Sequence, residues 1–528
     1  MSEAPEESPE SPEPTSESST AESEQLPQAP ADLAAKARDL GELRAAVVEA
    51  ANVGTGLWLS YLFALFYFLI ALGGISHRNL FFENPVRLPF LNVDLPLIGF
   101  FLLGPLIFLI VHAYVLLHFV LLATKIGVFD TELRLQIPDD DLRTRLRRQL
   151  PSNIFVQYLA GPRDVRSGVT GIMLQAIALI SLVIGPIALL VFFQLRFLPY
   201  HQEIITWWHR IAIVIDLSLL WLLWPSIARG GTIAHAWRGM RRGVVAGIAL
   251  LSLVPILLTF TIATFPGEWL EDHLPYNALH DMLVVGDVDL AAREPTSLWP
   301  NRLVLPGLDV VDHTRFDSEA KLTSSPETVS LRTRHLEGAM LIGAILRKAD
   351  FTGAQLRGAR LDGADLRGVQ FGCEHKDPAD PTQPLDEHAG NVKKEVCANL
   401  TGAILNGALM QRALLDGADL HGAELDGTQL QEASLNDANL RGAKLDRTNL
   451  QGASLRSARI QFASANGTML QGATLDGADL QGSSLQVAHL QAASLHGTQL
   501  QGADLSAAEL QAALLTKTKL HGATMYGT

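Results

Sequence analysis

One acidic side chain stands inside an otherwise apolar stretch, where it is well placed to do chemistry. Asp216 falls within the apolar run 211–227, and a carboxylate in hydrocarbon costs about 3 kcal/mol on insertion scales. It must therefore face other helices or water, and the expected partners are His112, His118 and Gln175. One interpretation is a proton or ion path. The other is an interhelical hydrogen bond that fixes packing, which is favoured because no second carboxylate lies in an apolar run.

Two cysteines, Cys373 and Cys397, are the second group that could react. Two thiols are too few for a four-cysteine zinc site or a disulfide-rich scaffold. They flank a segment that interrupts a regular repeat, so a disulfide at its base is expected if the geometry allows; the alternative is two free thiols. Because disulfides persist in oxidising compartments, a bond here predicts that this part of the chain lies outside the cytoplasm.

No motif for catalysis appears elsewhere. The sequence has no nucleophile elbow, phosphate-binding loop, HExxH pair or paired-carboxylate arrangement. Aspartates are frequent in the C-terminal third, but they recur with its repeat, so pairing any two as acid and base is arbitrary. The sequence predicts no catalytic residue, no cofactor and no bound metal, and hence a protein that is not an enzyme.

Five long apolar runs must position these groups in the N-terminal half. They are residues 57–75, 95–123, 169–193, 211–227 and 244–263. A helix needs about 20 apolar residues to cross a bilayer, so a helical transmembrane domain is expected over 31–265. The preceding residues 1–30 are rich in Glu, Ser and Pro, contain no Lys or Arg, and are expected to form a disordered acidic tail.

The basic residues of the connections predict the orientation of these spans. Eight Lys or Arg residues lie between the second and third runs and four between the fourth and fifth, against two in each of the other connections. Basic connections stay in the cytoplasm, and so does the N-terminus on this pattern. Five spans then place everything after Phe265 outside the cytoplasm. An even number of spans would reverse this and suit a cytoplasmic regulator.

From Leu331 the chain repeats every five residues, with a large apolar residue following a small one by two positions. The large positions include Leu336, Leu341, Phe351, Leu366, Phe371, Leu400, Leu420, Leu440, Leu480, Leu505 and Leu520. A period of five fits neither a helix nor a strand. It fits a solenoid whose coils have four sides, one pentapeptide on each, with both apolar positions inward. About nine coils at roughly 4.8 Å each make a rod about 42 Å long.

The repeat pattern A(D/N)LXX resembles that of the pentapeptide-repeat family. It occurs at Ala364-Asp365-Leu366, Ala418-Asp419-Leu420, Ala438-Asn439-Leu440 and Ala478-Asp479-Leu480. The resemblance covers roughly a third of the chain and implies a right-handed quadrilateral β-helix. The whole chain looks like the bacterial membrane-anchored pentapeptide-repeat proteins, and this implies a bacterial inner (plasma) membrane. The basic connections place the repeats on its extracytoplasmic side.

The charge of the repeat region argues against nucleic acid as a partner or as a mimicked target. The best-known soluble members of the family mimic DNA and block gyrase, which requires a strongly acidic rod. Residues 331–371 carry seven basic and four acidic side chains, and residues 400–528 carry eight basic and eleven acidic ones. The sum is zero, and a neutral rod does not imitate a polyanion.

The expected organisation after the spans is a linker at 266–330, the β-helix at 331–371, an inserted loop at 372–399 and the rest of the β-helix at 400–528. No helix covers the last coil, which predicts fraying or a homodimer through that coil. The predicted function is a membrane-tethered scaffold that contacts membrane lipid and an unknown protein or envelope component. The alternative is a transporter or ion-conducting protein that uses Asp216, with the rod as an accessory.

Overall fold

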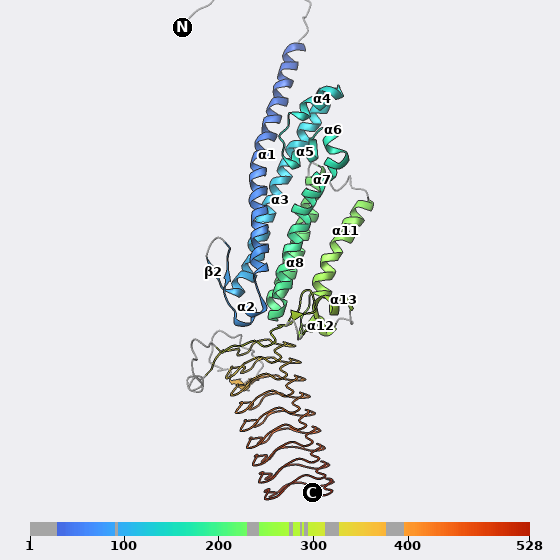
Figure 1. The fold of residues 1–528 in the computed structure, drawn as a ribbon. Helices are drawn as coiled ribbons and strands as arrows, with labels where there is room; N and C mark the ends of the chain where they lie inside the picture. Colours follow the sequence, from blue (N-terminus) through green and yellow to red (C-terminus); the bar gives the residue numbers. More distant parts are fainter. Residues whose placement is uncertain are drawn as a thin grey trace, which may run out of the picture.

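A helical bundle and a β-helix lie end to end along one long axis (Figure 1). The computed structural model describes residues 29–89, 93–229, 242–273, 278–285, 288–289, 294–311, 327–375 and 395–528. The predicted tail at 1–30 lies outside the described residues except for its last two, which begin the first helix. Most of the interrupting segment between Cys373 and Cys397 lies outside them too.

The bundle is built from long apolar helices joined by short ones. Its helices are α1 (Ala29–Gly73), α2 (His77–Phe82), α3 (Leu97–Gln136), α4 (Asp140–Arg148), α5 (Ile154–Ala160), α6 (Arg163–Arg166), α7 (Gly168–Leu179), α8 (Gly185–Phe197), α9 (Glu203–Arg229), α11 (Arg242–Leu257), α12 (Trp269–His273) and α13 (Ala278–His280). Three short π-helices are η1 (Ile180–Ile184), η3 (Leu258–Ile262) and η4 (Asp281–Val285), and one 3-10 helix is η2 (Leu198–Tyr200). Two small hairpins pair β1 (Val86–Arg87) with β2 (Asp94–Leu95) and β3 (Val288–Asp289) with β4 (Glu294–Pro295).

Five helical stretches are long and apolar enough to cross a membrane, counted over the residues described above. They are Asp39–Gly73, Leu97–Gln136, Gly168–Tyr200, Glu203–Arg229 and Arg242–Ile262. Each coincides with one of the five apolar runs seen in the sequence, and no run extends more than two residues beyond its helical stretch. Many of their large apolar side chains are exposed, which is the pattern expected where lipid replaces water as the surrounding solvent.

Aromatic rings fill the centre of the bundle between α1, α3, α8 and α9. The ring centroids of Phe101 and Phe197 are 4.7 Å apart, and those of Phe100 and Phe193 are 5.6 Å apart. Gly104 of α3 permits this packing, because an added Cβ would lie 2.8 Å from the Phe193 ring. A small residue at the crossing thus lets an aromatic side chain of α8 lie directly against the α3 backbone.

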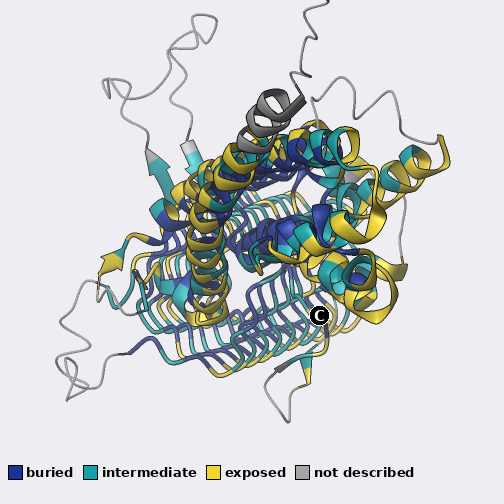
Figure 2. Ribbon diagram, turned by 90° about the horizontal axis from the view of Figure 1, so that it is seen from above, coloured by how far each residue is buried: buried dark blue, intermediate teal, exposed yellow. Residues whose placement is uncertain are grey.

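The C-terminal half is a stack of square coils, seen end-on in Figure 2. Asn399 pairs in parallel with Asp419, and Asp419 pairs in the same way with Asn439, so neighbouring coils are twenty residues apart. Four pentapeptides per coil therefore match the predicted solenoid. The predicted centres from Leu336 to Leu505 are at most 2% exposed, whereas Leu520 is only half-buried because no described coil covers it.

The β-helix begins earlier than the sequence pattern predicts. Val304 pairs in parallel with Met340 and Asp309 with Ile345, so residues 303–311 form two sides of a preceding coil. The prediction of a linker over 266–330 is therefore wrong for this stretch. Leu303 and Leu308 occupy the inward positions that hold Ala, Ser or Thr in later coils, and this substitution concealed the repeat.

Candidate functional site

His112 of α3 and Asp216 of α9 form a buried polar pair between helices. The His112 Nδ1 atom lies 2.6 Å from Oδ1 of Asp216, and both side chains are completely buried. The other ring nitrogen, Nε2, lies 3.2 Å from the carbonyl oxygen of Leu182 in η1. Tyr61 of α1 stacks on the His112 ring with centroids 5.6 Å apart, and its hydroxyl donates to the Ser181 carbonyl oxygen at 3.0 Å.

Both ring nitrogens of His112 thus face oxygen acceptors. Two hydrogens satisfy these contacts: one on Nε2 for the Leu182 carbonyl, and one held between Nδ1 and the carboxylate. With these two hydrogens the pair carries no net charge, whichever atom holds the shared one. Since an uncharged pair costs less to bury than a lone carboxylate, the geometry suits a tie between α3, α9 and the π-helical turn η1.

The other two predicted partners of Asp216 are elsewhere, so this part of the prediction is wrong. His118 lies 3.3 Å from the Ala50 carbonyl oxygen through Nε2 and so connects α3 to α1. It is six residues from His112, which at 3.6 residues per turn places it on another side of the helix. Gln175 is exposed on α7. The second carboxylate oxygen of Asp216 has no hydrogen-bond partner among the described residues.

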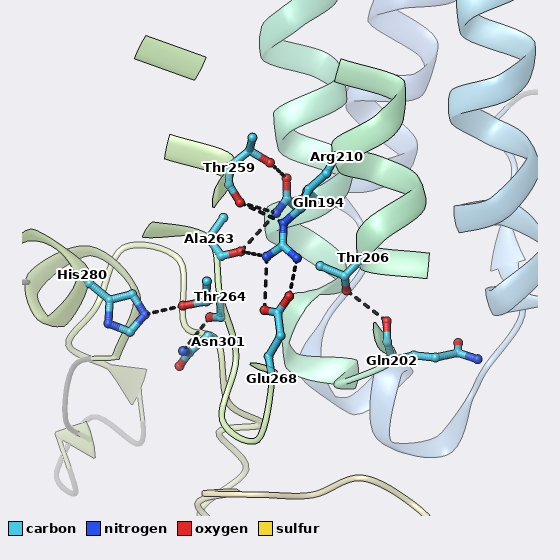
Figure 3. Close-up of polar contacts among 10 residues, drawn as sticks. All are labelled: Gln194, Gln202, Thr206, Arg210, Thr259, Ala263, Thr264, Glu268, His280 and Asn301. Carbon is cyan, nitrogen blue, oxygen red and sulfur yellow. Dashed lines mark hydrogen bonds and ion pairs between the residues drawn. The ribbon is translucent and has the colours of Figure 1, made fainter. Parts of the chain in front are cut away.

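A second buried site fastens the end of the fifth candidate span (Figure 3). The guanidinium of Arg210 in α9 pairs with Glu268, with Nη2 3.1 Å from Oε2, and both side chains are completely buried. Its Nε and Nη2 donate to the carbonyl oxygens of Thr259 and Ala263, each at 3.1 Å. Gln194 of α8 donates to the same two carbonyls at 3.1 and 3.0 Å. Arginine and glutamine therefore satisfy acceptors at the end of η3 that no helical N–H reaches.

The first coils of the β-helix are held against the helix ends by a set of contacts that we call the collar: Glu83, Tyr200, His201, Arg334 and Glu337. Arg334 reaches up from the β-helix, and its Nη1 donates to Oε1 of Glu83 at 2.7 Å. The guanidinium lies 4.7 Å from the Tyr200 ring centroid, and the Tyr200 hydroxyl donates to the same Glu83 oxygen at 2.8 Å. Arg334 also donates to the carbonyl oxygens of α2 residues Leu80 and Phe81 at 3.1 and 3.2 Å.

The other side of the collar is centred on Glu337. Its carboxylate lies 3.2 Å from His201 Nδ1 and 3.0 Å from His335 Nδ1. His201 Nε2 in turn lies 2.6 Å from the carbonyl oxygen of Asn301, and the Asn301 amide donates to the Thr264 carbonyl at 2.9 Å. These bonds connect α8, the turn after η3 and the β-helix, so the orientation of the β-helix on the bundle is fixed.

The histidines set the protonation of Glu337. Burial by itself raises the pKa of this carboxyl, but the hydrogen bonds and charges of His201 and His335 outweigh burial and lower its pKa to about 2. The hydrogen bond with Glu337 likewise raises the pKa of His335 above its ordinary value, although burial opposes it. The collar is therefore an ionic contact that weakens when Glu337 is protonated at low pH and when His335 is deprotonated at high pH.

Cys373 and Cys397 form a disulfide in the structure. They lie in β5 (Cys373–His375) and β6 (Glu395–Cys397), which pair antiparallel with the two cysteines opposite each other. Beyond the pair, Gln355 bonds to Asn399 as a normal neighbouring coil. The interrupting segment thus leaves and re-enters the β-helix at one point without disturbing the stack.

Gly417 in the next coil should be intolerant of a side chain because of this disulfide. An added Cβ would lie 2.6 Å from Cys373 Sγ, whereas at Gly407 it would meet nothing within 4 Å. Both glycines have positive φ, 71° and 66°, so each change to alanine carries the left-handed penalty of about 1–2 kcal/mol. We expect Gly417→Ala to lower the melting temperature more than Gly407→Ala under oxidising conditions. Equal shifts would contradict the contact.

The sequence did not point to Arg210, Glu268 or the collar as sites. Arg210 is one of two basic residues in a weakly basic connection, and it immediately precedes the apolar run 211–227. Arg334 was visible as a departure from the repeat, since it occupies a position that holds Ala in the next coils. A charged residue at an inward position of a repeat signals a contact outside the repeat.

Comparisons with known proteins agree with the coil geometry. The sequence profile described as "Pentapeptide repeats" matches in eight copies, over residues 335–369, 396–431, 433–472, 469–506 and 493–528. A search of curated proteins found no match.

Among solved structures, QnrB1, a plasmid-mediated fluoroquinolone resistance protein, is 20% identical over 37% of this chain and 88% of its own, with a TM-score of 0.23. HetL, a pentapeptide repeat protein involved in heterocyst differentiation regulation in the cyanobacterium Nostoc, is 26% identical over 42% of this chain and 90% of its own, with a TM-score of 0.18. These scores are low, so the assignment rests on the repeat itself. The repeats over residues 335–369, 396–431 and 433–528 match the pentapeptide-repeat family, and repeats of this kind imply a right-handed β-helix.

Proposed function

We propose that this protein is a non-enzymatic, membrane-anchored scaffold of the bacterial inner membrane that holds a stiff β-helical rod at a fixed angle outside the cytoplasm. The observation that carries the proposal is the collar. Arg334 and Glu337 of the β-helix bond directly to Glu83 and His201 at the helix ends, and Asn301 extends the contact to Thr264. A rod needed only as a flexible tether has no use for such a joint.

The sidedness rests on two independent features. Five candidate spans with basic connections on one side favour an outward C-terminal half. A disulfide between Cys373 and Cys397 suits an oxidising compartment. The rod, about 42 Å long at roughly 4.8 Å per coil, would then present its sides to a protein or other component of the envelope.

Cysteine labelling on intact cells tests this placement. A membrane-impermeant maleimide should label the protein only after a reductant has opened the disulfide, because these are its two cysteines and both are bonded. A double Cys373→Ser, Cys397→Ser variant is the control for background labelling. Labelling that requires cell lysis and no reductant would place the rod in the cytoplasm and favour a cytoplasmic regulator.

A second candidate function is proton or ion conduction through the bundle. The unpartnered Oδ2 of Asp216 beside the π-helical turn η1 favours it, since such turns are frequent at functional sites. Asp216→Asn should discriminate between the two. If the pair is only a tie, the variant loses about 1–2 kcal/mol of stability and keeps its cellular phenotype. Loss of the phenotype with an unchanged melting temperature would favour conduction.

A further inference from the structure

Four rows of corners run along the β-helix: three rows contain several non-glycine residues of positive φ, and the fourth corner departs from glycine in a single coil. Nine successive coils place a residue of positive φ, between 59° and 70°, at this corner. These residues are Gly338, Gly358, Gly402, Gly422, Gly442, Phe462, Gly482, Gly502 and Gly522. Eight are glycine, the residue that adopts this backbone without penalty, and one is phenylalanine. Phe462 therefore carries backbone strain that its own fold does not require.

Burial within the chain does not offset this strain. The Phe462 side chain is 64% exposed. One edge of its ring lies over Gly482, where an added Cβ would be 2.9 Å from the ring, and the Arg441 guanidinium lies 5.7 Å from its centroid. An exposed aromatic ring that is held in place by neighbours is the kind of residue that anchors protein interfaces.

The coil that precedes Phe462 is rich in basic residues, although the repeat region as a whole is neutral. Residues 441–459 contain five basic and one acidic side chain, while residues 416–437 contain six acidic and no Lys or Arg. Lys444 is paired with Glu424 in the preceding coil. Arg441 and Arg459 are exposed and form no ion pair with any residue that the structure describes. Arg441 thus lies 5.7 Å from the ring centroid, and Arg459 lies three residues before Phe462 in the chain, beside Asp479 of the next coil.

We propose that Phe462, Arg441 and Arg459 form a docking site for an acidic segment of a partner protein. The ring would pack against an apolar side chain of the partner, while the two arginines pair with its carboxylates in the bidentate manner that arginine favours. The site lies five coils beyond Leu336, about 24 Å along the rod at roughly 4.8 Å per coil. The inference goes beyond the scaffold function by naming the surface and the chemistry of its partner.

Photocrosslinking in intact cells tests the site with the full-length protein. Benzoylphenylalanine replaces Gln461, which neighbours the ring, and the crosslinked peptide is identified by mass spectrometry. The same probe is placed in three further backgrounds: Phe462→Gly, the double variant Arg441→Glu with Arg459→Glu, and Val487→Gly. Val487 is the matched control, because it is 55% exposed with a φ of 58° at another corner. Both glycine variants relieve the same strain, so neither should impair folding, and melting temperatures confirm this.

The expected result is an adduct with a protein segment of net negative charge. Its yield should fall at least about tenfold, the loss typical of removing an interface anchor, in Phe462→Gly and in the double arginine variant, and should stay unchanged in Val487→Gly. An adduct with lipid, glycan, a second copy of this chain or a segment without net negative charge would overturn the proposal. So would the absence of any adduct, or an equal yield in all four backgrounds. Failure here leaves the labelling result unaffected, so the docking site and the scaffold function can fail separately.

Discussion

Arg210→Met should lower the free energy of unfolding by about 3–5 kcal/mol, the range found when one partner of a buried ion pair is removed. The change leaves Glu268 buried without its charge partner and deprives the carbonyl oxygens of Thr259 and Ala263 of a donor. We expect the melting temperature of the detergent-solubilised protein to fall sharply. The fifth candidate span should also detach first, which can be followed by protease sensitivity of the chain after Ile262.

Two further variants make this result specific. The double variant Arg210→Met with Glu268→Leu removes both charges and should recover most of the lost stability, since apolar replacement of a buried pair is often neutral. Arg412→Met is the matched control, because Arg412 pairs with Glu432 on the rod with both side chains largely exposed, 74% and 62%. Such pairs contribute about 0–1 kcal/mol. If Arg210→Met costs no more than Arg412→Met, the pair of Arg210 with Glu268 does not hold the fifth candidate span.

Stability of the collar should depend on pH, and Glu337→Gln should abolish that dependence. The pKa of Glu337 is lowered from 4.5 to about 2, so its ionised form contributes about 3 kcal/mol above pH 4.5. This contribution is lost as the pH falls toward the folded pKa. His335, whose pKa is raised above 6.5, contributes below that value and loses its contribution as the pH rises through its folded pKa. The wild-type advantage over Glu337→Gln should therefore be greatest at weakly acidic pH.

Melting temperatures of both proteins across this pH range give the measurement. The difference between them should form a bell, small in strong acid, largest in the weakly acidic range, and reduced again in alkali. Glu432→Gln on the exposed rod pair serves as the control and should follow the wild-type curve. A difference that is constant with pH would show that Glu337 acts by packing and not by charge.

The sequence predicted the architecture well where a local pattern repeats. A five-residue period over 336–371 and again over 400–505 is enough to place the inward side chains, because each coil buries its core only against its neighbours. Prediction from the sequence failed at Leu303 and Leu308. These residues belong to a coil, but they are large at the inward position where the repeat has a small residue. The repeat pattern does not reveal this first coil because one side of it faces the helical bundle and not another coil.

Contacts between distant segments were harder to foresee. Asp216 was recognised by its cost in an apolar run, and its partner His112 was among those expected. His118 lies on another side of its helix and does not contact Asp216. The sequence alone does not give the rotation of one helix relative to another, so it does not distinguish His112 from His118. The collar joins Glu83 to Arg334, 251 residues apart, and no local pattern encodes such a separation. The net charge of the repeat region was also misleading, because a sum of zero concealed an acidic stretch at 416–437 followed by a basic stretch at 441–459.

The fixed joint at the collar has a mechanical consequence. A rod that is stiff along its length and rigidly mounted acts as a lever, with an arm of about 42 Å at roughly 4.8 Å per coil. A sideways pull near the far coils therefore becomes a torque at Arg334 and Glu337, and these residues pass it to α2 and to the turn between α8 and α9. A load on the far coils would in this way reach α9, whose other end lies on the opposite side of the bundle.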